Sequence, residues 1–176
     1  MEKIRTEANF TEVNPMSELN PYAKYLDGRP PESILPSTAA QLALLLQAIG
    51  PGRAATPPAP GKWSPAEILC HLADCELAFG FRLRQTLAED NHVVQPFDQE
   101  KWAATYAGIP VAESLAAFTA FRSWNLHLIA AALPHAANRT VTHPERGAMT
   151  FLTIVETMAG HDLNHIAQLQ KLAAAG

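Results

Sequence analysis

The chain has 176 residues, a formal net charge of −4, 48% hydrophobic residues and 17% charged residues. This composition is typical of one folded domain spanning residues 1–176 and excludes a disordered chain. The negative charge and the lack of any lysine or arginine cluster argue against a nucleic acid as partner.

Residues 1–14 are polar and acidic and lack the apolar core of a signal peptide. No apolar run reaches the roughly 18 residues that are needed to cross a bilayer. We therefore expect a cytoplasmic protein with no membrane partner. Cys70 and Cys75 are five residues apart in a predicted helix, a spacing that does not align their side chains for a disulfide, so both should be reduced.

Apolar residues recur at helical spacing between breaks rich in proline and glycine, and no stretch shows the alternation of a strand. The sequence therefore predicts an all-α protein. Residues 1–35 form an N-terminal arm whose prolines prevent a long helix, although residues 21–26 favour a helical turn or two. The first long helix is predicted to begin after Pro36, with Ser37 as its N-cap, and to end at Gly50.

The second helix has the clearest start signal in the chain. After a proline-rich linker, Ser64 is suited to cap the helix, Pro65 suits its first position, and Glu67 completes a capping box. The helix should run to about Glu89. Its inward stripe consists of Ile68, His71 or Leu72, Cys75, Phe79 and Leu83.

Two more amphipathic helices are predicted, one from about Pro110 to Leu133 and one from about Thr150 to Ala174. Four such helices indicate a four-helix bundle over residues 37–174. The segment from Asp90 to Ile109 is longer than an antiparallel helix pair needs. We therefore expect a long crossover that leaves the second and third helices parallel.

A histidine pair lies on the inner face of the last predicted helix. His161 and His165 are four residues apart, so their side chains stand one turn above the other. Seven histidines placed at random give such a pair in about one chain in four, so the spacing alone is weak evidence. The inward position adds weight, because a buried imidazole needs a partner to offset its desolvation.

His71 lies on the inward stripe of the second helix and can supply a third nitrogen from the facing side. Three neutral imidazoles suit zinc, nickel, copper or Fe(II), and three protein ligands leave coordination positions open for water or a substrate. The alternative is that these histidines are core or surface residues held by hydrogen bonds. A zincin-type protease is disfavoured, because Asp162 replaces the glutamate of the HExxH motif and no ligand residue follows His165.

Several polar side chains near these histidines are further candidates. Asp74, Glu76 and Asp162 can accept a hydrogen bond from a ligating imidazole or lie on a solvated face. Arg122 is predicted to face inward, where it needs a protein carboxylate, which we favour, or an anionic substrate. Asp74, Asp162 and Arg122 are therefore the catalytic candidates. Cys75 is better explained as a small buried residue than as a ligand.

Four stretches, in order, resemble the DinB-like superfamily of metalloenzymes, also called DinB/YfiT-like. They are Trp63–Glu76, Phe97–Trp102, His143–Gly147 and Gly160–Gln168. Each is weak alone, but their ordered combination is specific. The resemblance extends over most of the chain from about residue 35 onward.

The resemblance implies an up-down-down-up four-helix bundle with His71, His161 and His165 as ligands of one divalent metal ion, nickel or zinc. It also implies a homodimer. Members of the family with known activity are thiol-dependent, such as mycothiol-dependent maleylpyruvate isomerase and bacillithiol transferases. We therefore expect an enzyme that acts on a small-molecule substrate, as a transferase that uses a low-molecular-weight thiol. The alternatives are a non-catalytic binding or stress-related protein stabilised by the metal, and a metal-dependent hydrolase.

Overall fold

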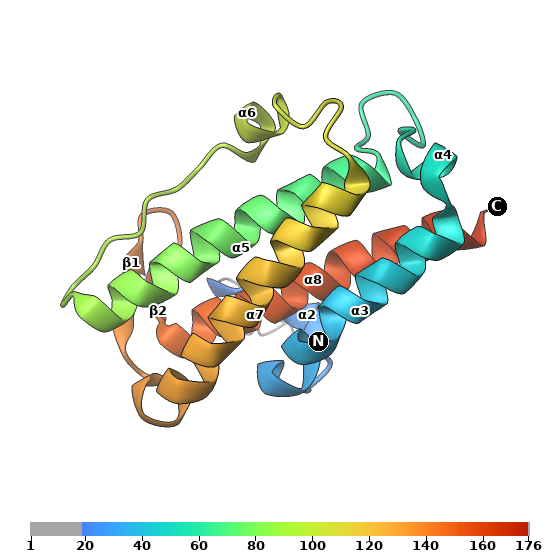
Figure 1. Ribbon diagram of the computed structural model, residues 1–176. Helices are drawn as coiled ribbons and strands as arrows, with labels where there is room; N and C mark the ends of the chain where they lie inside the picture. Colours follow the sequence, from blue (N-terminus) through green and yellow to red (C-terminus); the bar gives the residue numbers. More distant parts are fainter. Residues whose placement is uncertain (1–18, 176) are drawn as a thin grey trace, which may run out of the picture.

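Four long amphipathic helices pack side by side in the computed structural model, which describes residues 19–175 (Figure 1). Helix α5 packs on α7, and α3 packs on α8 and α7. The predicted all-α four-helix bundle is confirmed. The four helices are α3 (Pro31–Ile49), α5 (Pro65–Ala88), α7 (Val111–Ala136) and α8 (Phe151–Ala174).

Within residues 20–175, three short helices lie in the segments around the bundle, namely α2 (Ala23–Leu26), α4 (Pro51–Ala54) and α6 (Gln99–Ala103). The first of them confirms the helical turn expected in the proline-rich arm. Residues 1–18 of that arm lie outside the described residues. None of the described helices is long and apolar enough to span a membrane.

The connection between α5 and α7 runs back along the bundle, so that both helices point the same way (Figure 1). Two backbone hydrogen bonds of 2.9 Å tie this crossover to a strand: Val94 N–H donates to Thr142 O, and Thr142 N–H donates to His92 O. The buried Tyr106 anchors its other end, because its hydroxyl donates to Asp74 Oδ2 at 2.7 Å. The expected crossover is therefore confirmed.

The start of the first long helix differs from the prediction. Helix α3 begins at Pro31, and Pro36 lies inside it. Pro31 suits the first position, where no N–H is needed, and burial of Leu35 offsets the one backbone hydrogen bond that Pro36 removes. Ser37 does not cap the helix but donates from Oγ to the Ile34 carbonyl at 2.9 Å.

A short antiparallel hairpin connects α7 to α8 and was not expected from the sequence. Strand β1 (Thr140–His143) pairs with β2 (Gly147–Thr150), and β1 alternates exposed and buried residues. Strands of four residues are too short to stand out against helical patterns of twenty or more. Gly147 has a φ of 82°, a left-handed conformation that glycine adopts without strain.

The bundle interior has two apolar cores separated by a polar layer. One core lies around Leu83, Phe151 and Met158, and the other around Leu69 and Phe118. Between them every long helix contributes buried polar side chains. This polar layer consists of Thr38, His71, Glu76, Arg122, Asn125, His161, Asp162 and His165.

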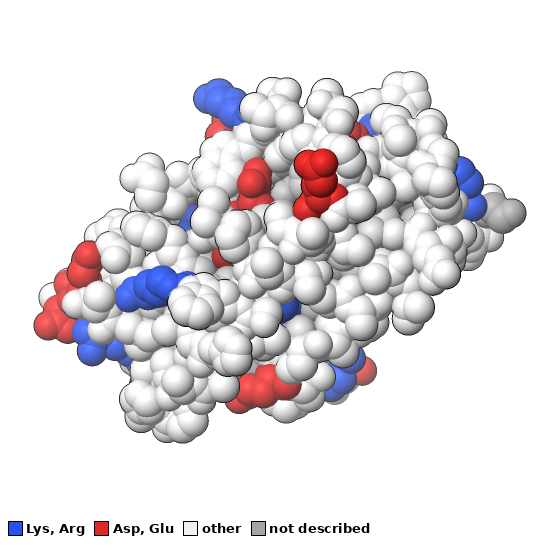
Figure 2. All heavy atoms as spheres, viewed as in Figure 1, with Lys and Arg blue, Asp and Glu red and all other residues white. Residues whose placement is uncertain are grey.

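The surface in view carries a few small groups of charged side chains, some with both signs side by side, separated by wide uncharged areas (Figure 2). This sparse pattern fits a chain in which only 17% of the residues are charged.

Candidate metal centre

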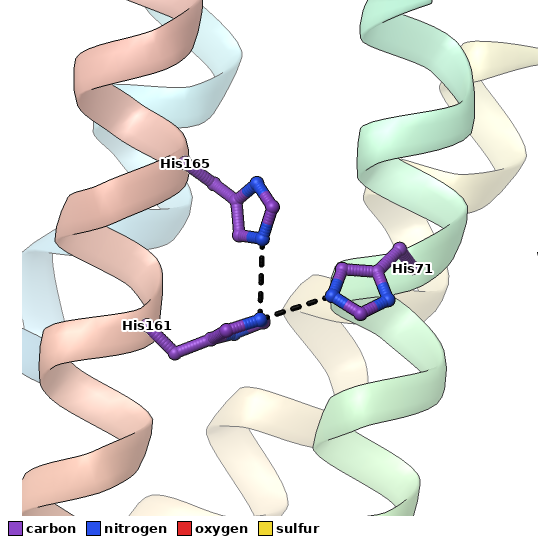
Figure 3. A group of neighbouring side chains, drawn as sticks. All are labelled: His71, His161 and His165. Carbon is purple, nitrogen blue, oxygen red and sulfur yellow. Dashed lines mark hydrogen bonds between the residues drawn. The ribbon is translucent and has the colours of Figure 1, made fainter. Parts of the chain in front are cut away.

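The three predicted histidines converge in the polar layer, His71 from α5 and His161 and His165 from α8 (Figure 3). His161 Nε2 lies 3.0 Å from His71 Nε2 and 3.1 Å from His165 Nε2. One ligand atom from each residue lies within 4.8 Å of the others. The helical spacing of His161 and His165 therefore does aim both rings at the facing helix.

The local sequence explains why His71 reaches this point. The capping box forms as predicted, because Ser64 Oγ accepts from Glu67 N–H at 3.2 Å and Glu67 Oε2 accepts from Ser64 N–H at 2.7 Å. With Pro65 in the first position, this cap fixes the start of α5. The rotation of the helix, and with it the direction of His71, follows from that start.

The surroundings keep all three imidazoles uncharged. Burial, followed by the repulsion that a protonated His165 would exert, lowers the pKa of His71 to about 3. Burial also lowers the pKa of His161 well below its usual value, and that of His165 in the same direction. Neutral imidazole is the form that binds metals.

The hydrogen bonds of the rings indicate which nitrogens are free. His165 Nδ1 lies 3.1 Å from Gln168 Oε1, an acceptor, so Nδ1 carries the proton and Nε2 offers a lone pair. Nitrogens bonded at about 2.0–2.1 Å to one ion lie roughly 2.9–3.4 Å apart. The two short contacts of His161 Nε2, at 3.0 and 3.1 Å, fall within that range. Two of the three nitrogen pairs therefore have the separation that one divalent ion requires, and all three donors lie within 4.8 Å of one another.

Aromatic rings enclose the histidines on two sides. The Trp63 ring centre lies 4.9 Å from that of His71, and the Tyr22 ring centre lies 5.1 Å from that of His161. Gly160 allows Tyr22 to lie this close, because a Cβ at position 160 would be 2.6 Å from the Tyr22 carbonyl oxygen. No sequence pattern indicated Tyr22, because this residue before α2 meets His161 only through a tertiary contact.

Cys75 lies next to the histidines without joining their group. Its Sγ is 3.6 Å from His71 Nε2, but across residues 19–175 the convergent donors are the three imidazoles alone. Burial, followed by the charges of nearby carboxylates, raises the pKa of the Cys75 thiol. Both Cys70 and Cys75 are free and buried, as expected.

The predicted inward arginine lies at the centre of a buried ion network. Arg122 Nη1 donates to Asp162 Oδ2 and Nη2 donates to Glu76 Oε1, both at 2.6 Å. Nη1 also donates to Thr38 Oγ1 at 2.5 Å, and Asn125 Nδ2 donates to the second Glu76 oxygen at 3.0 Å. Burial alone would lower the pKa of Arg122, but the two carboxylates raise it. The favoured protein partner of Arg122 is thus confirmed.

This network links the helices that carry the histidines. Asp162 follows His161 on α8, and Glu76 lies five residues after His71 on α5. Arg122 of α7 bonds both carboxylates, so it holds α5 and α8 in a fixed relation. Of the catalytic candidates, Arg122 and Asp162 therefore pair with each other, while Asp74 is separate and accepts from Tyr106.

A pocket of about 530 Å³ adjoins His165. Its apolar walls include Trp63, Ile68 and Leu172. Its polar lining residues are Lys62, Gln99, Glu100, His165, Gln168 and Lys171, and its volume is in the range of small-molecule sites. A small molecule in this pocket can therefore reach the histidine cluster at His165.

The sequence also matches a known protein family. A family model of the DinB superfamily matches residues 35–169. The chain belongs to the DinB superfamily. The resemblance inferred from the four ordered motifs is thereby confirmed.

Curated relatives of this DinB-superfamily chain carry names that refer to metal. A protein of Oceanobacillus iheyensis named "Putative metal-dependent hydrolase" is 29% identical over 113 residues, which cover 64% of this chain and 66% of that protein, just under two thirds of its length. A protein of the same description from Bacillus mycoides is 25% identical over 118 residues, which cover 66% of this chain and 68% of that protein.

A solved structure confirms the fold of this DinB-superfamily chain. YfiT from Bacillus subtilis, described as "a probable metal-dependent hydrolase with an unusual four-helix bundle topology", matches with a TM-score of 0.75 and 17% identity. The match covers 98% of this chain and 93% of YfiT. Identity this low supports the shared bundle topology and nothing about the reaction.

Proposed function

We propose that this protein is a metal-dependent enzyme in which His71, His161 and His165 hold one divalent ion, nickel or zinc. The observation that carries the proposal is the convergence of three buried, neutral imidazoles on one point, with no fourth donor among the described residues. Catalytic metal sites commonly have three protein ligands and an open position, whereas structural sites are closed. The open set therefore favours an enzyme over the alternative of a non-catalytic protein stabilised by metal.

We further propose that the enzyme is a transferase that uses a low-molecular-weight thiol. A divalent ion held by the histidines would supply Lewis acidity, which favours the deprotonated form of a coordinated thiol or water. The carboxylates nearest the donors are already engaged, since Asp162 accepts from Arg122 and Asp74 accepts from Tyr106. A reaction that needs no nearby free carboxylate as general base, such as attack by a thiolate, suits this arrangement best.

Metal-dependent hydrolysis is the second candidate, favoured by the names of the curated relatives. Hydrolysis needs a group that accepts a proton from water. Glu100 of α6, which lines the pocket beside His165, is the carboxylate available for that role. Glu100→Gln would then lower hydrolytic turnover while leaving the metal content unchanged.

Metal analysis of protein purified without a histidine tag tests the site. About one equivalent of nickel or zinc is expected in the wild-type protein, with loss of most of it in His71→Ala, His161→Ala and His165→Ala. His127→Ala removes an exposed histidine on α7 and is the matched control, which should keep its metal. Stoichiometric metal in all three variants would contradict the proposal.

Turnover assays then separate the two reactions. Bacillithiol, mycothiol and glutathione are each supplied with an electrophilic acceptor, and an activated ester is supplied without any thiol. Metal-dependent consumption of a thiol supports the transferase, and metal-dependent ester cleavage alone supports the hydrolase. Equal rates with and without metal would contradict both. The homodimer stays a prediction, which light scattering on the purified protein tests directly.

A further inference from the structure

The pocket beside His165 is built by three separate parts of the chain. The linker before α5 contributes Lys62, α6 of the crossover contributes Glu100, and the end of α8 contributes Lys171. All three side chains are exposed, and none of them forms an ion pair with another residue in the range 19–175. Their charges are therefore available to a ligand in the pocket.

The charge of this pocket is opposite in sign to that of the protein. The chain has 13 lysines and arginines against 17 aspartates and glutamates, so it is acidic overall. The pocket has two lysines against one glutamate, a net charge of +1. A concave site with a locally reversed sign concentrates ligands of the opposite charge.

The two lysines are separated from the histidine cluster by apolar side chains and by Gln168, which lies between His165 and Lys171 on α8. Lys171 lies six residues after His165, which corresponds to about 9 Å along the helix axis. Trp63 and Ile68 line the space on the α5 side, and Leu172 lines it on α8. A ligand that spans this distance would contact Trp63, Ile68 and Leu172 along its length, with Gln168 as the polar group between the two ends.

We propose that the pocket takes a small organic acid, with one end reaching the metal site and a carboxylate at the other end bound by Lys62 and Lys171. This inference rests on the proposed metal site and adds the class of ligand. The two lysine ammonium groups attract the carboxylate, and the apolar walls contact the chain between the two ends.

A series of thiols that differ only in the charge of the far end tests this inference on full-length protein loaded with cobalt. The probes are 6-mercaptohexanoate, 6-mercaptohexan-1-ol and 6-mercaptohexylamine. Each is titrated while the visible spectrum of cobalt reports thiolate coordination, which gives a Kd for each charge. The anion should bind tightest and the cation weakest.

Lysine variants test whether Lys62 and Lys171 cause the preference for the anionic thiol. Lys62→Met and Lys171→Met should each weaken binding of the anion about two- to fivefold and leave binding of the alcohol unchanged. Glu100→Gln removes a negative charge from the pocket and should therefore strengthen binding of the anion. Lys24→Met, which removes an exposed lysine on α2 away from the pocket, is the control for net charge and should change neither value. Added salt should reduce the preference for the anion, because exposed charges are screened.

The outcomes distinguish this inference from the function on which it rests. Protein that binds no cobalt refutes the metal site, and the inference with it. Cobalt-loaded protein that binds all three thiols equally, or whose spectrum none of them changes, refutes the anion pocket and leaves the metal site standing. A preference for the anion that is undiminished in both Lys62→Met and Lys171→Met also refutes it.

Discussion

Replacing Arg122 by methionine should be among the most destabilising single substitutions in this protein. Arg122 and its partners Glu76 and Asp162 are each 2% exposed, so removing the guanidinium leaves two buried carboxylates without a cation. Breaking one buried pair costs about 3–5 kcal/mol. Because Arg122 serves two carboxylates, we expect a loss near the upper value, about 5 kcal/mol, and a fall in Tm of roughly 10–20 °C.

Urea denaturation followed by circular dichroism measures this loss. Combining Arg122→Met with Glu76→Gln and Asp162→Asn should recover at least about 2 kcal/mol, because no uncompensated charge then remains buried. Lys101→Met breaks an exposed pair with Asp98 and should change stability little. The reasoning is refuted if Arg122→Met loses less than about 1 kcal/mol or if the triple variant is no more stable than the single one. If Arg122→Met does not fold, Glu76→Gln can be measured in its place, because it leaves Arg122 paired with Asp162. Its loss of unfolding free energy should be smaller than that expected for Arg122→Met but larger than that of Lys101→Met.

Three further predictions concern other parts of the bundle. Gly160→Ala should destabilise the protein by about 1–3 kcal/mol, because its Cβ would overlap Tyr22, whereas Gly52→Ala, with no atom within 4 Å, should not; equal melting curves for the two variants would contradict this. Burial and the charge of Glu32 raise the pKa of Glu156. The free energy of unfolding should therefore fall as the pH rises from the unfolded-state pKa of Glu156 to its higher folded-state pKa. Glu156→Gln should therefore stabilise the protein at pH 7.5 and lose this advantage below about pH 4, as thermal melts at both pH values would show. The thiol of Cys75 should react with a disulfide reagent only after denaturant is added, because it is buried with a raised pKa, and rapid labelling of the native protein would contradict this.

The parts of the fold that the sequence predicted are those with strong local signals. The capping box at Ser64 placed the start of α5 correctly, and the length of the following connection predicted the crossover. The start of α3 was placed too late, because the local cost of Pro36 was visible and the burial of Leu35 that offsets it was not. The hairpin was missed because each of its strands has only four residues.

In the candidate site, too, the residues found from the sequence are those with a local pattern, and those missed depend on tertiary contacts. Helical spacing and inward position identified His161 and His165, and the inward stripe of α5 identified His71. The partners of Arg122 could be expected as a class but not by position, since they come from two other helices. Lys62 and Lys171 were not singled out, because only the tertiary fold places both of them in the lining of one pocket.

The crossover and the polar layer differ in how tightly their side chains are packed. The three histidines and the ion network that braces them lie on rigid helices, where a change in one side chain disturbs the packing of several others. Much of the pocket wall, in contrast, lies on the linker before α5 and on the crossover, which tolerate insertion and substitution. A substitution in the linker or the crossover can therefore reshape the pocket wall without disturbing the packing that holds the three histidines.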